Sequence, residues 1–242
     1  MARILQATCL ALAALVLAGC AVVEDKAPDY RYRLTVEIET PDGVKSGSSV
    51  IEVRQTLVRA GSSPANQAVE RRVRGEAVAV DLPGGKTLFA LLRSDNDIDW
   101  VSRVYVLLTP QRREAFEDAM DNVLEVTGER TLPRMWPANV IMPKRSAYPM
   151  MVTFRDPADP TTVALVNPDD LAAKFGEGVK LKRITVELTD ERVTSGIEER
   201  LKWLPQVRGA LVHLPMSEYP PVGTPLPLYN TLTERDFSQD DG

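Results

Sequence analysis

A strict alternation of apolar and polar side chains in residues 33–39, RLTVEIE, constrains the fold of this chain more than any other feature. Leu34, Val36 and Ile38 fall on one face, which is the period of a half-buried β-strand. The turn-forming stretch PDGVKSG comes next, at 41–47, and apolar residues recur in 48–58. The pattern therefore predicts a β-hairpin with one face on a hydrophobic core.

Further strands and a few helices are predicted along the chain. A second hairpin flanks the turn Pro83-Gly84-Gly85, and its return strand has the composition of a strand buried on both faces. Further single strands are predicted at 100–108, 150–154, 179–189 and 207–214. A long helix is predicted to begin after Thr109 and Pro110 and to end before Gly128, and short helices are predicted at 167–176 and 195–204.

These elements predict an α+β fold, with a mainly antiparallel sheet, one long helix and one or two short helices. The folded part would span residues 30–215, as one domain or as two lobes that divide near Thr131. Residues 216–242 are rich in proline and are predicted to form an extended tail, which could lie over the domain.

The amino-terminal segment has the three-part layout of a secretory signal: Arg3, an apolar run and an end of small residues. Its last residues, Leu17-Ala18-Gly19-Cys20, resemble the lipobox of bacterial lipoproteins. The resemblance implies that residues 1–19 are a signal peptide, that Cys20 becomes the lipidated first residue, and that residues 20–29 form a tether. The thiolate is the nucleophile that such an acylation needs.

Position 21 is Ala rather than Asp, and in the lipoprotein family this implies export to the outer membrane, facing the periplasm. Anchoring at the inner membrane is the alternative. A further alternative is a single transmembrane span, because the apolar run from Ile4 to Val23 has about the length that a bilayer requires. Against a span, much of the run is alanine, and the flanking residues Glu24, Asp25 and Lys26 form no cationic stop signal.

Composition excludes several classes of function. The formal net charge of −5 makes nucleic acid an improbable partner. Cys9 leaves with the signal peptide and Cys20 is consumed by lipid, so no thiol remains for a disulfide, a metal or catalysis. His213 is the one histidine, which removes most zinc sites, and no cofactor is expected.

The stretch SDNDIDW places Asp95, Asp97 and Asp99 at alternate positions, as in the first half of a calcium-binding loop. The sixth and twelfth positions of such a loop would be Trp100 and Val106, so the required glycine and the closing glutamate are missing. A solvated acidic loop between strands is the simpler interpretation, and these aspartates stay a weak metal candidate.

Other polar groups have ordinary structural explanations. His213 stands in an apolar stretch, which favours a hydrogen-bonded structural histidine over a catalytic base. Lys86 comes after two glycines but lacks the spacing of a phosphate-binding loop. Arg71, Arg72 and Arg74 fit a solvated strand edge better than a recognition patch.

A pair of carboxylates could hydrolyse glycosidic bonds without histidine or cysteine. The acids in or just after predicted strands are Glu37, Glu39, Glu187, Asp190 and Glu191. The sequence therefore supports two hypotheses. The first is a non-enzymatic envelope lipoprotein that binds a partner protein or an envelope component. The second is a hydrolase of envelope glycans, which requires two facing acids in a cleft beside exposed aromatics such as Trp100 or Trp136.

Two stretches, residues 32–54 and 167–204, resemble segments of uncharacterised proteobacterial hypothetical proteins. That family has no function that could be carried over, so the resemblance implies no active-site residue.

Overall fold

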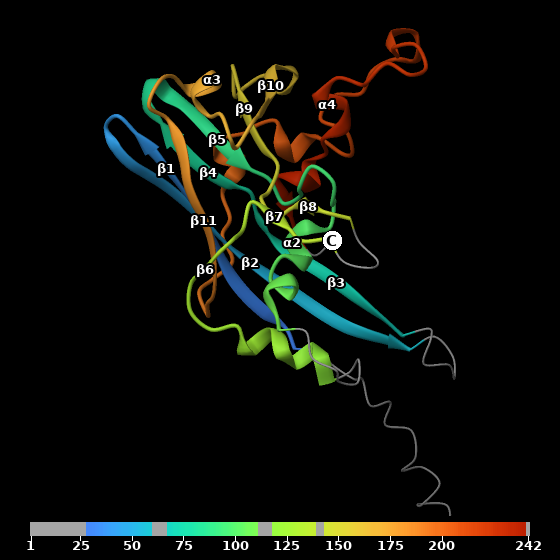
Figure 1. Cartoon of the computed structure of the whole chain (residues 1–242). Coiled ribbons are helices and arrows are strands. Elements are labelled where there is room, and N and C mark those ends of the chain that lie inside the picture. The colour runs from blue at the N-terminus through green and yellow to red at the C-terminus, as the bar shows by residue number, and fades with distance from the viewer. Residues whose placement is uncertain (1–27, 60–66, 111–117, 139–142, 241–242) are drawn as a thin grey trace, which may run out of the picture.

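The computed structural model describes residues 28–59, 67–110, 118–138 and 143–240 of the chain (Figure 1). Cys20 and the apolar segment before it lie outside these residues. The described strands pair antiparallel throughout and form sheets of six, four and two strands. The prediction of a mainly antiparallel fold is therefore confirmed.

The six-stranded sheet has the order β12-β3-β2-β1-β11-β6. The predicted hairpin is β1 and β2, which pair from Tyr30 with Val53 to Thr40 with Gly43. Gly43 adopts a φ of 106°, in the left-handed region that favours glycine. The bounds are β1 Tyr30–Thr40, β2 Gly43–Arg59, β3 Gln67–Glu76, β6 Arg130–Thr131, β11 Lys180–Leu188 and β12 Ser238–Gln239.

The four-stranded sheet has the order β10-β9-β5-β4. The second predicted hairpin is confirmed as β4 and β5, joined by the 3-10 turn η2, Pro83–Gly85. Both faces of β5 are buried as predicted, because Leu88 and Phe89 belong to two different cores. The bounds are β4 Val78–Leu82, β5 Lys86–Ala90, β9 Met151–Phe154 and β10 Val163–Val166; the two-stranded sheet is β7 Met135–Trp136 and β8 Arg145–Ser146.

The larger hydrophobic core lies between the six-stranded and four-stranded sheets. Alternate residues of β1 face it, as the sequence predicts: Tyr30, Tyr32, Leu34, Val36 and Ile38. Strand β2 approaches β4 so closely here that a Cβ atom added to Gly47 would lie 2.1 Å from the carbonyl oxygen of Ala79. The two sheets can meet at this point because position 47 has no side chain.

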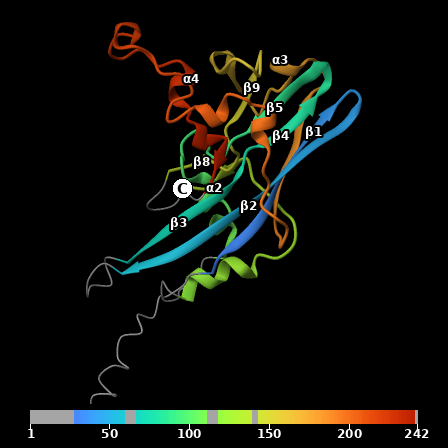
Figure 2. The ribbon, with the colours of Figure 1, turned by 180° about the vertical axis from the view of Figure 1, so that it is seen from behind.

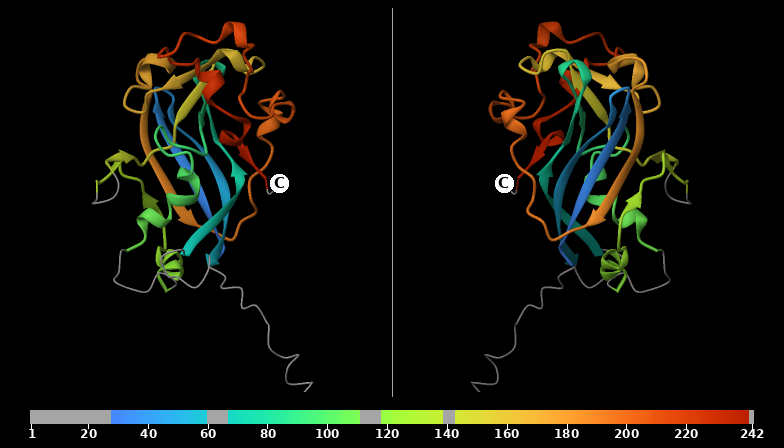
Figure 3. Two further views of the ribbon diagram at one scale, coloured as in Figure 1. Left: turned by 90° about the vertical axis from the view of Figure 1, so that its right-hand side faces the viewer. Right: turned by 90° about the vertical axis from the view of Figure 1, so that its left-hand side faces the viewer.

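A second core covers the other face of the four-stranded sheet and is closed by the C-terminal segment. The rings of Phe154 and Phe237 lie 5.9 Å apart between their centroids, and Phe237 is fully buried. The stretch predicted as an extended tail thus contains α4 Leu228–Thr231, η9 Glu234–Asp236 and β12. Figures 2 and 3 show these elements, in red, along one side of the strands.

Strands from both sides of Thr131, the position of the predicted division into lobes, pair with each other. Strand β1 pairs with β11 from Tyr32 opposite Leu188 to Glu39 opposite Lys180, so residues on both sides of Thr131 share one sheet. Strand β6, which contains Thr131, itself pairs with β11.

The predicted long helix is not supported. Residues 111–117 lie outside the described part, and the chain after them forms a 3-10 helix, η4 Asp118–Glu125, the only described helical element longer than seven residues. The strand predicted at 100–108 is also wrong, because α2 Trp100–Arg103 and η3 Val106–Leu108 stand there. Trp100, Val101, Val104 and Tyr105 are all buried at helical spacing against β1, which explains the helix.

The remaining helical predictions are partly met. The short helix predicted at 167–176 is α3, Ala172–Phe175, and Gly176 ends it with a φ of 106°. Residues 195–204 form 3-10 turns, η6 Ile197–Glu199 and the start of η7 Leu204–Gln206, rather than one helix. Residues 207–214 form no strand, because Gly209 turns the chain with a φ of 79° and only Ala210 makes an isolated bridge, to Thr233. The other 3-10 turns are η5 Pro160–Thr162 and η8 Met216–Glu218.

Candidate functional site

The three alternating aspartates lie in a loop between β5 and α2, not in an extended segment. Arg103 pairs with two of them, at 3.3 Å from Asp97 Oδ1 and 2.6 Å from Asp99 Oδ2. Asp95 is exposed. Among the described residues no group of three acidic, histidine or cysteine side chains is placed to hold a metal ion. Two of the three aspartates, Asp97 and Asp99, pair with Arg103 instead.

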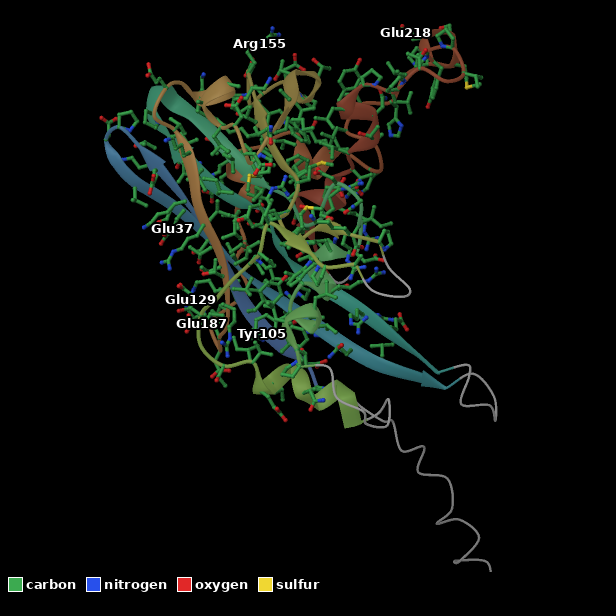
Figure 4. The ribbon with its side chains drawn as sticks, viewed as in Figure 1. Glu37, Tyr105, Glu129, Arg155, Glu187 and Glu218 are labelled. Carbon is green, nitrogen blue, oxygen red and sulfur yellow. The ribbon has the colours of Figure 1, made fainter. Side chains whose placement is uncertain are left out.

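Two of the predicted strand carboxylates, Glu37 and Glu187, are paired with arginines on the outer face of the six-stranded sheet (Figure 4). Glu37 contacts Arg183 at 2.8 Å and Lys182 at 3.1 Å, and these cations lower the pKa of Glu37 to about 2. Arg33 pairs with both Glu187 and Glu191. A carboxylate held ionised in this way has no proton to give to a leaving group, so Glu37 is unsuited to be a general acid.

The aromatic residues and the histidine singled out in the sequence do not gather into a site. Trp100 and Trp136 are buried rather than exposed as the hydrolase hypothesis requires, and the Trp100 indole N–H donates to the carbonyl of Ala147. His213 is exposed rather than on a buried strand, and its Nε2 lies 3.0 Å from the Arg208 carbonyl oxygen.

The basic residues singled out by sequence have defined partners. Arg71 is not on a solvated face, because it is half-buried and donates to Gln55 at 3.0 Å. Arg74 lies 3.7 Å from Glu52, and Arg72 lies 3.4 Å from Glu70. Lys86 donates to the carbonyl of Lys174 and takes part in no phosphate loop. Asp190 and Glu52 line an open pocket of about 510 Å³ at the start of β1.

Glu76 is a buried acid that sequence reasoning missed. It ends β3, just before the chain passes at Ala77 into β4 and so changes sheets. Its carboxylate oxygens accept hydrogen bonds from the backbone N–H groups of Gly196, at 2.8 Å, and Ile197, at 3.0 Å. Burial outweighs these bonds and raises the pKa of Glu76 to about 7. In the sequence, the burial of Glu76 is indicated only by its place as a single acidic residue just before the apolar stretch that forms β4.

Glu76 borders a pocket of about 560 Å³, whose other lining residues come from 195–208 and 234–240. Its lining is mixed in charge, with Glu198, Glu234 and Asp240 beside Arg208 and Arg235. Glu76 itself is 6% exposed, so little of its carboxylate reaches the pocket. The pocket lies next to the base of a projecting loop, because Arg208 in its lining also contacts His213.

That loop, residues 213–227, is termed the arm, and Figures 1 and 2 show it projecting from the body. Its stem is closed by backbone bonds from Leu211 N–H to Leu232 O, at 3.0 Å, and from Val212 N–H to Tyr229 O, at 3.1 Å. The side chain of Asn230 adds a bond of 2.6 Å to the Val212 carbonyl. Since Leu211 and Leu232 are buried in the second core, the stem is fixed to the body.

The arm exposes large apolar side chains. Met216 is 88% exposed, Tyr219 is 52% exposed, and Val222 is fully exposed; Leu226 is also exposed. Val222 occupies the tip of a β-turn, in which Thr224 N–H donates to Pro221 O at 3.0 Å and Gly223 has a φ of 93°. Large exposed apolar side chains held out from the body of a protein are typical of an interaction site.

The arm and the start of β1 lie at opposite ends of the molecule. The rings of Tyr30 and Tyr105 are 5.8 Å apart between centroids, so Tyr105 marks the start of β1. Figure 4 shows Tyr105 in the lower part of the body and Glu218, at the tip of the arm, at the far upper end. Whatever precedes β1 therefore joins the body far from the arm.

Comparison with protein-family models, with curated proteins and with solved structures found no match. None of the described helices is both long enough and apolar enough to cross a membrane.

Proposed function

We propose that this protein is a lipid-anchored binding module of the bacterial cell envelope, which carries a partner on its arm. The observation that carries this function is the placement of exposed Met216, Tyr219 and Val222 on a fixed stem, at the end opposite the start of β1. A tether entering at β1 would direct the arm away from the membrane surface.

The anchor in this proposal is Cys20, the last residue of the lipobox-like sequence LAGC. Acylation would hold the protein on the bilayer, since several acyl chains, each contributing about 0.8 kcal/mol per buried methylene, anchor a domain stably. With Ala21 next in the chain, the proposed address is the outer membrane, facing the periplasm, with the inner membrane as the alternative.

The anchor is tested by growing cells with a clickable fatty acid. The wild-type protein should carry the label, Cys20→Ala should lose it and enter the soluble fraction, and Cys9→Ala should keep it. Mass spectrometry of the mature amino terminus should find acylated Cys20 as the first residue. A protein that begins upstream of this residue, or that carries no lipid mass there, contradicts the anchor.

The proposed location in the outer membrane can be tested separately by changing Ala21, the residue after the cysteine. The variant Ala21→Asp should move the protein from the outer-membrane to the inner-membrane fraction of a sucrose gradient, without changing fatty-acid labelling. Wild-type protein already in the inner-membrane fraction would support the alternative address.

A glycan hydrolase is the second candidate function, and one observation favours it. Glu76 has a pKa of about 7 beside a pocket lined by Glu198 and Glu234, as a general acid would require. Its slight exposure and its bonds to Gly196 and Ile197 favour a structural role. Turnover of purified peptidoglycan that is lost in Glu76→Gln would support the hydrolase.

A further inference from the structure

We propose that the pocket bordered by Glu76 binds a short peptide by its two charged ends. The ammonium group of the peptide contacts Glu198 and Asp240, and its carboxylate contacts Arg208 and Arg235. This inference goes beyond the proposed function, because it concerns a pocket in the body of the protein rather than the arm. It does not depend on how the protein is anchored.

The pocket has the size and the lining of a site for a small polar ligand. Its volume of about 560 Å³ lies within the range of about 300–1,000 Å³ that is usual for such sites. Leu204 and Pro205 give the lining an apolar part. Ser195, Ser238 and Gln239 add groups that both donate and accept hydrogen bonds. The remaining lining residues are charged, so a ligand that fits carries charge together with some apolar surface.

The charges of this lining do not neutralise one another. The two acids and the two arginines named above form no ion pair with any residue in the described part of the chain. They differ in this from Arg103, Arg183 and Arg200, each of which lies 2.6–2.8 Å from a carboxylate oxygen. Opposite charges that line one pocket without pairing are both available to a ligand that carries both charges.

The acids gather on one side of the pocket. Glu198 and Asp240 lie close enough to Glu76 that their negative charges raise its pKa. Glu76 is only 6% exposed and accepts bonds from two backbone N–H groups, so it lies beneath this side rather than on it. An ammonium group bound by Glu198 and Asp240 would offset the repulsion among the three carboxylates.

The arginines belong to two elements that are bonded to each other. Glu234 Oε2 accepts a hydrogen bond from Gly209 N–H at 2.8 Å, and Glu234 N–H donates to the Gly209 carbonyl at 3.3 Å. These bonds hold the loop that carries Arg208 against η9, which carries Arg235. Arg208 donates to carbonyls of its own loop through Nη1, and its other nitrogens bond no described residue. Two guanidinium groups held in this way match a carboxylate.

A single ion does not match the pocket. A cation would satisfy the acids and leave the arginines unmatched, and an inorganic anion would do the reverse. Among the described residues no group of three acids is placed to hold a metal ion. A free amino acid carries both charges on one carbon. A peptide separates its two ends and also brings apolar side chains for Leu204 and Pro205 to contact.

Titration calorimetry with trialanine tests the proposal on the full-length protein in detergent. Trialanine should bind, and N-acetyl-trialanine and trialanine amide should each bind at least about tenfold more weakly, because each has lost one charged end and its hydrogen bonds. Free alanine should also bind at least about tenfold more weakly, because it cannot reach both sides of the pocket. These comparisons need no change in the protein.

Two variants assign the ends of the peptide to the two sides of the pocket. Arg208→Gln should weaken trialanine binding at least about tenfold without changing the affinity for trialanine amide, and Glu198→Gln should do the same with N-acetyl-trialanine as the unaffected ligand. Glu199→Gln and Arg155→Gln are matched controls, because both residues are exposed and neither is a lining residue. All four variants should keep the wild-type melting temperature, since all four side chains are exposed.

The proposal is overturned if trialanine does not bind at concentrations up to about 10 mM, or if alanine or the blocked peptides bind as tightly as trialanine. Trialanine binding that survives Arg208→Gln and Glu198→Gln, or that the control variants weaken equally, overturns it too. The anchor is scored separately, because Cys20→Ala should lose fatty-acid labelling while keeping the affinity for trialanine. Loss of labelling without loss of affinity, and the reverse, distinguish the two proposals.

Discussion

Glu76 and Gly196 are 120 residues apart in the chain, yet a hydrogen bond of 2.8 Å joins the carboxylate of one to the backbone N–H of the other. The bond ties the corner between β3 and β4 to the start of η6, Ile197–Glu199. At the same corner, Ala77 N–H donates to the Phe237 carbonyl at 2.8 Å, and Ser238 of β12 pairs with Glu76. This corner therefore joins the two main sheets and the segment that closes the second core.

The first prediction concerns the pH dependence of stability. Burial raises the pKa of Glu76 from 4.5 to about 7, so the folded protein binds this proton more tightly than the unfolded chain. Stability from Glu76 is therefore fully present below pH 4.5 and lost as the pH rises through 7, with a span of about 3 kcal/mol. Urea unfolding between about pH 5 and pH 8 should show this loss.

The control for this prediction is Glu76→Gln, a neutral isostere that cannot titrate. Burial also raises the pKa of Asp236, which acts in the same direction in both proteins. The difference between wild type and variant should therefore isolate Glu76. Identical pH profiles for the two proteins would mean that Glu76 is ionised throughout this range.

The second prediction concerns the contact between the two main sheets. Gly47→Ala should lower the free energy of unfolding by about 3 kcal/mol, because the new methyl group meets the Ala79 carbonyl, a backbone group that cannot rotate away. Ser48→Ala is the matched control, since Ser48 is exposed on the outer face of the same strand. Equal stability of the two variants would contradict the close approach of β2 and β4.

The third prediction separates the two parts of the C-terminal segment. Phe237→Ala should destabilise the protein by about 3–5 kcal/mol, because Phe237 is fully buried among aromatic rings of the second core. Val222→Ala in the arm should leave the melting temperature unchanged. If Phe237→Ala melts like the wild type, the C-terminal segment does not close the core.

The fourth prediction concerns a buried hydroxyl on β1. Tyr32 O–H donates to the Val101 carbonyl at 2.6 Å and anchors α2 to the six-stranded sheet. Tyr32→Phe should cost about 1–2 kcal/mol, because the carbonyl loses its partner inside the core. Tyr219→Phe, which changes an exposed tyrosine, should cost nothing in the same thermal unfolding experiment.

The hairpins can be predicted from the sequence because their information is local. Alternation in β1 and the turn at Gly43 fix both the strand and its partner without reference to the rest of the chain. The stretch 100–108 is wrongly predicted as a strand, because valine and aromatic residues favour strands by propensity. Packing of Trp100 and Tyr105 against β1 overrides that propensity.

The candidate site is harder to predict than the fold. The prolines after Pro215 indicate an extended segment, but the exposure of Met216 and Val222 depends on a stem closed by Val212 and Tyr229. Glu76 escapes prediction because its burial depends on Gly196, which is distant in sequence. Both features come from contacts between remote segments, which no single stretch of residues contains.

The position of β1 has a mechanical consequence. Strand β1 is bonded along its length to β2 on one side and to β11 on the other. A force applied between the proposed tether, at the start of β1, and a partner bound to the arm would act along β1. Many of the hydrogen bonds that pair β1 with β2 and β11 would then bear this force at the same time. A protein held in this way would resist a tension that breaks the bonds of an edge strand one after another.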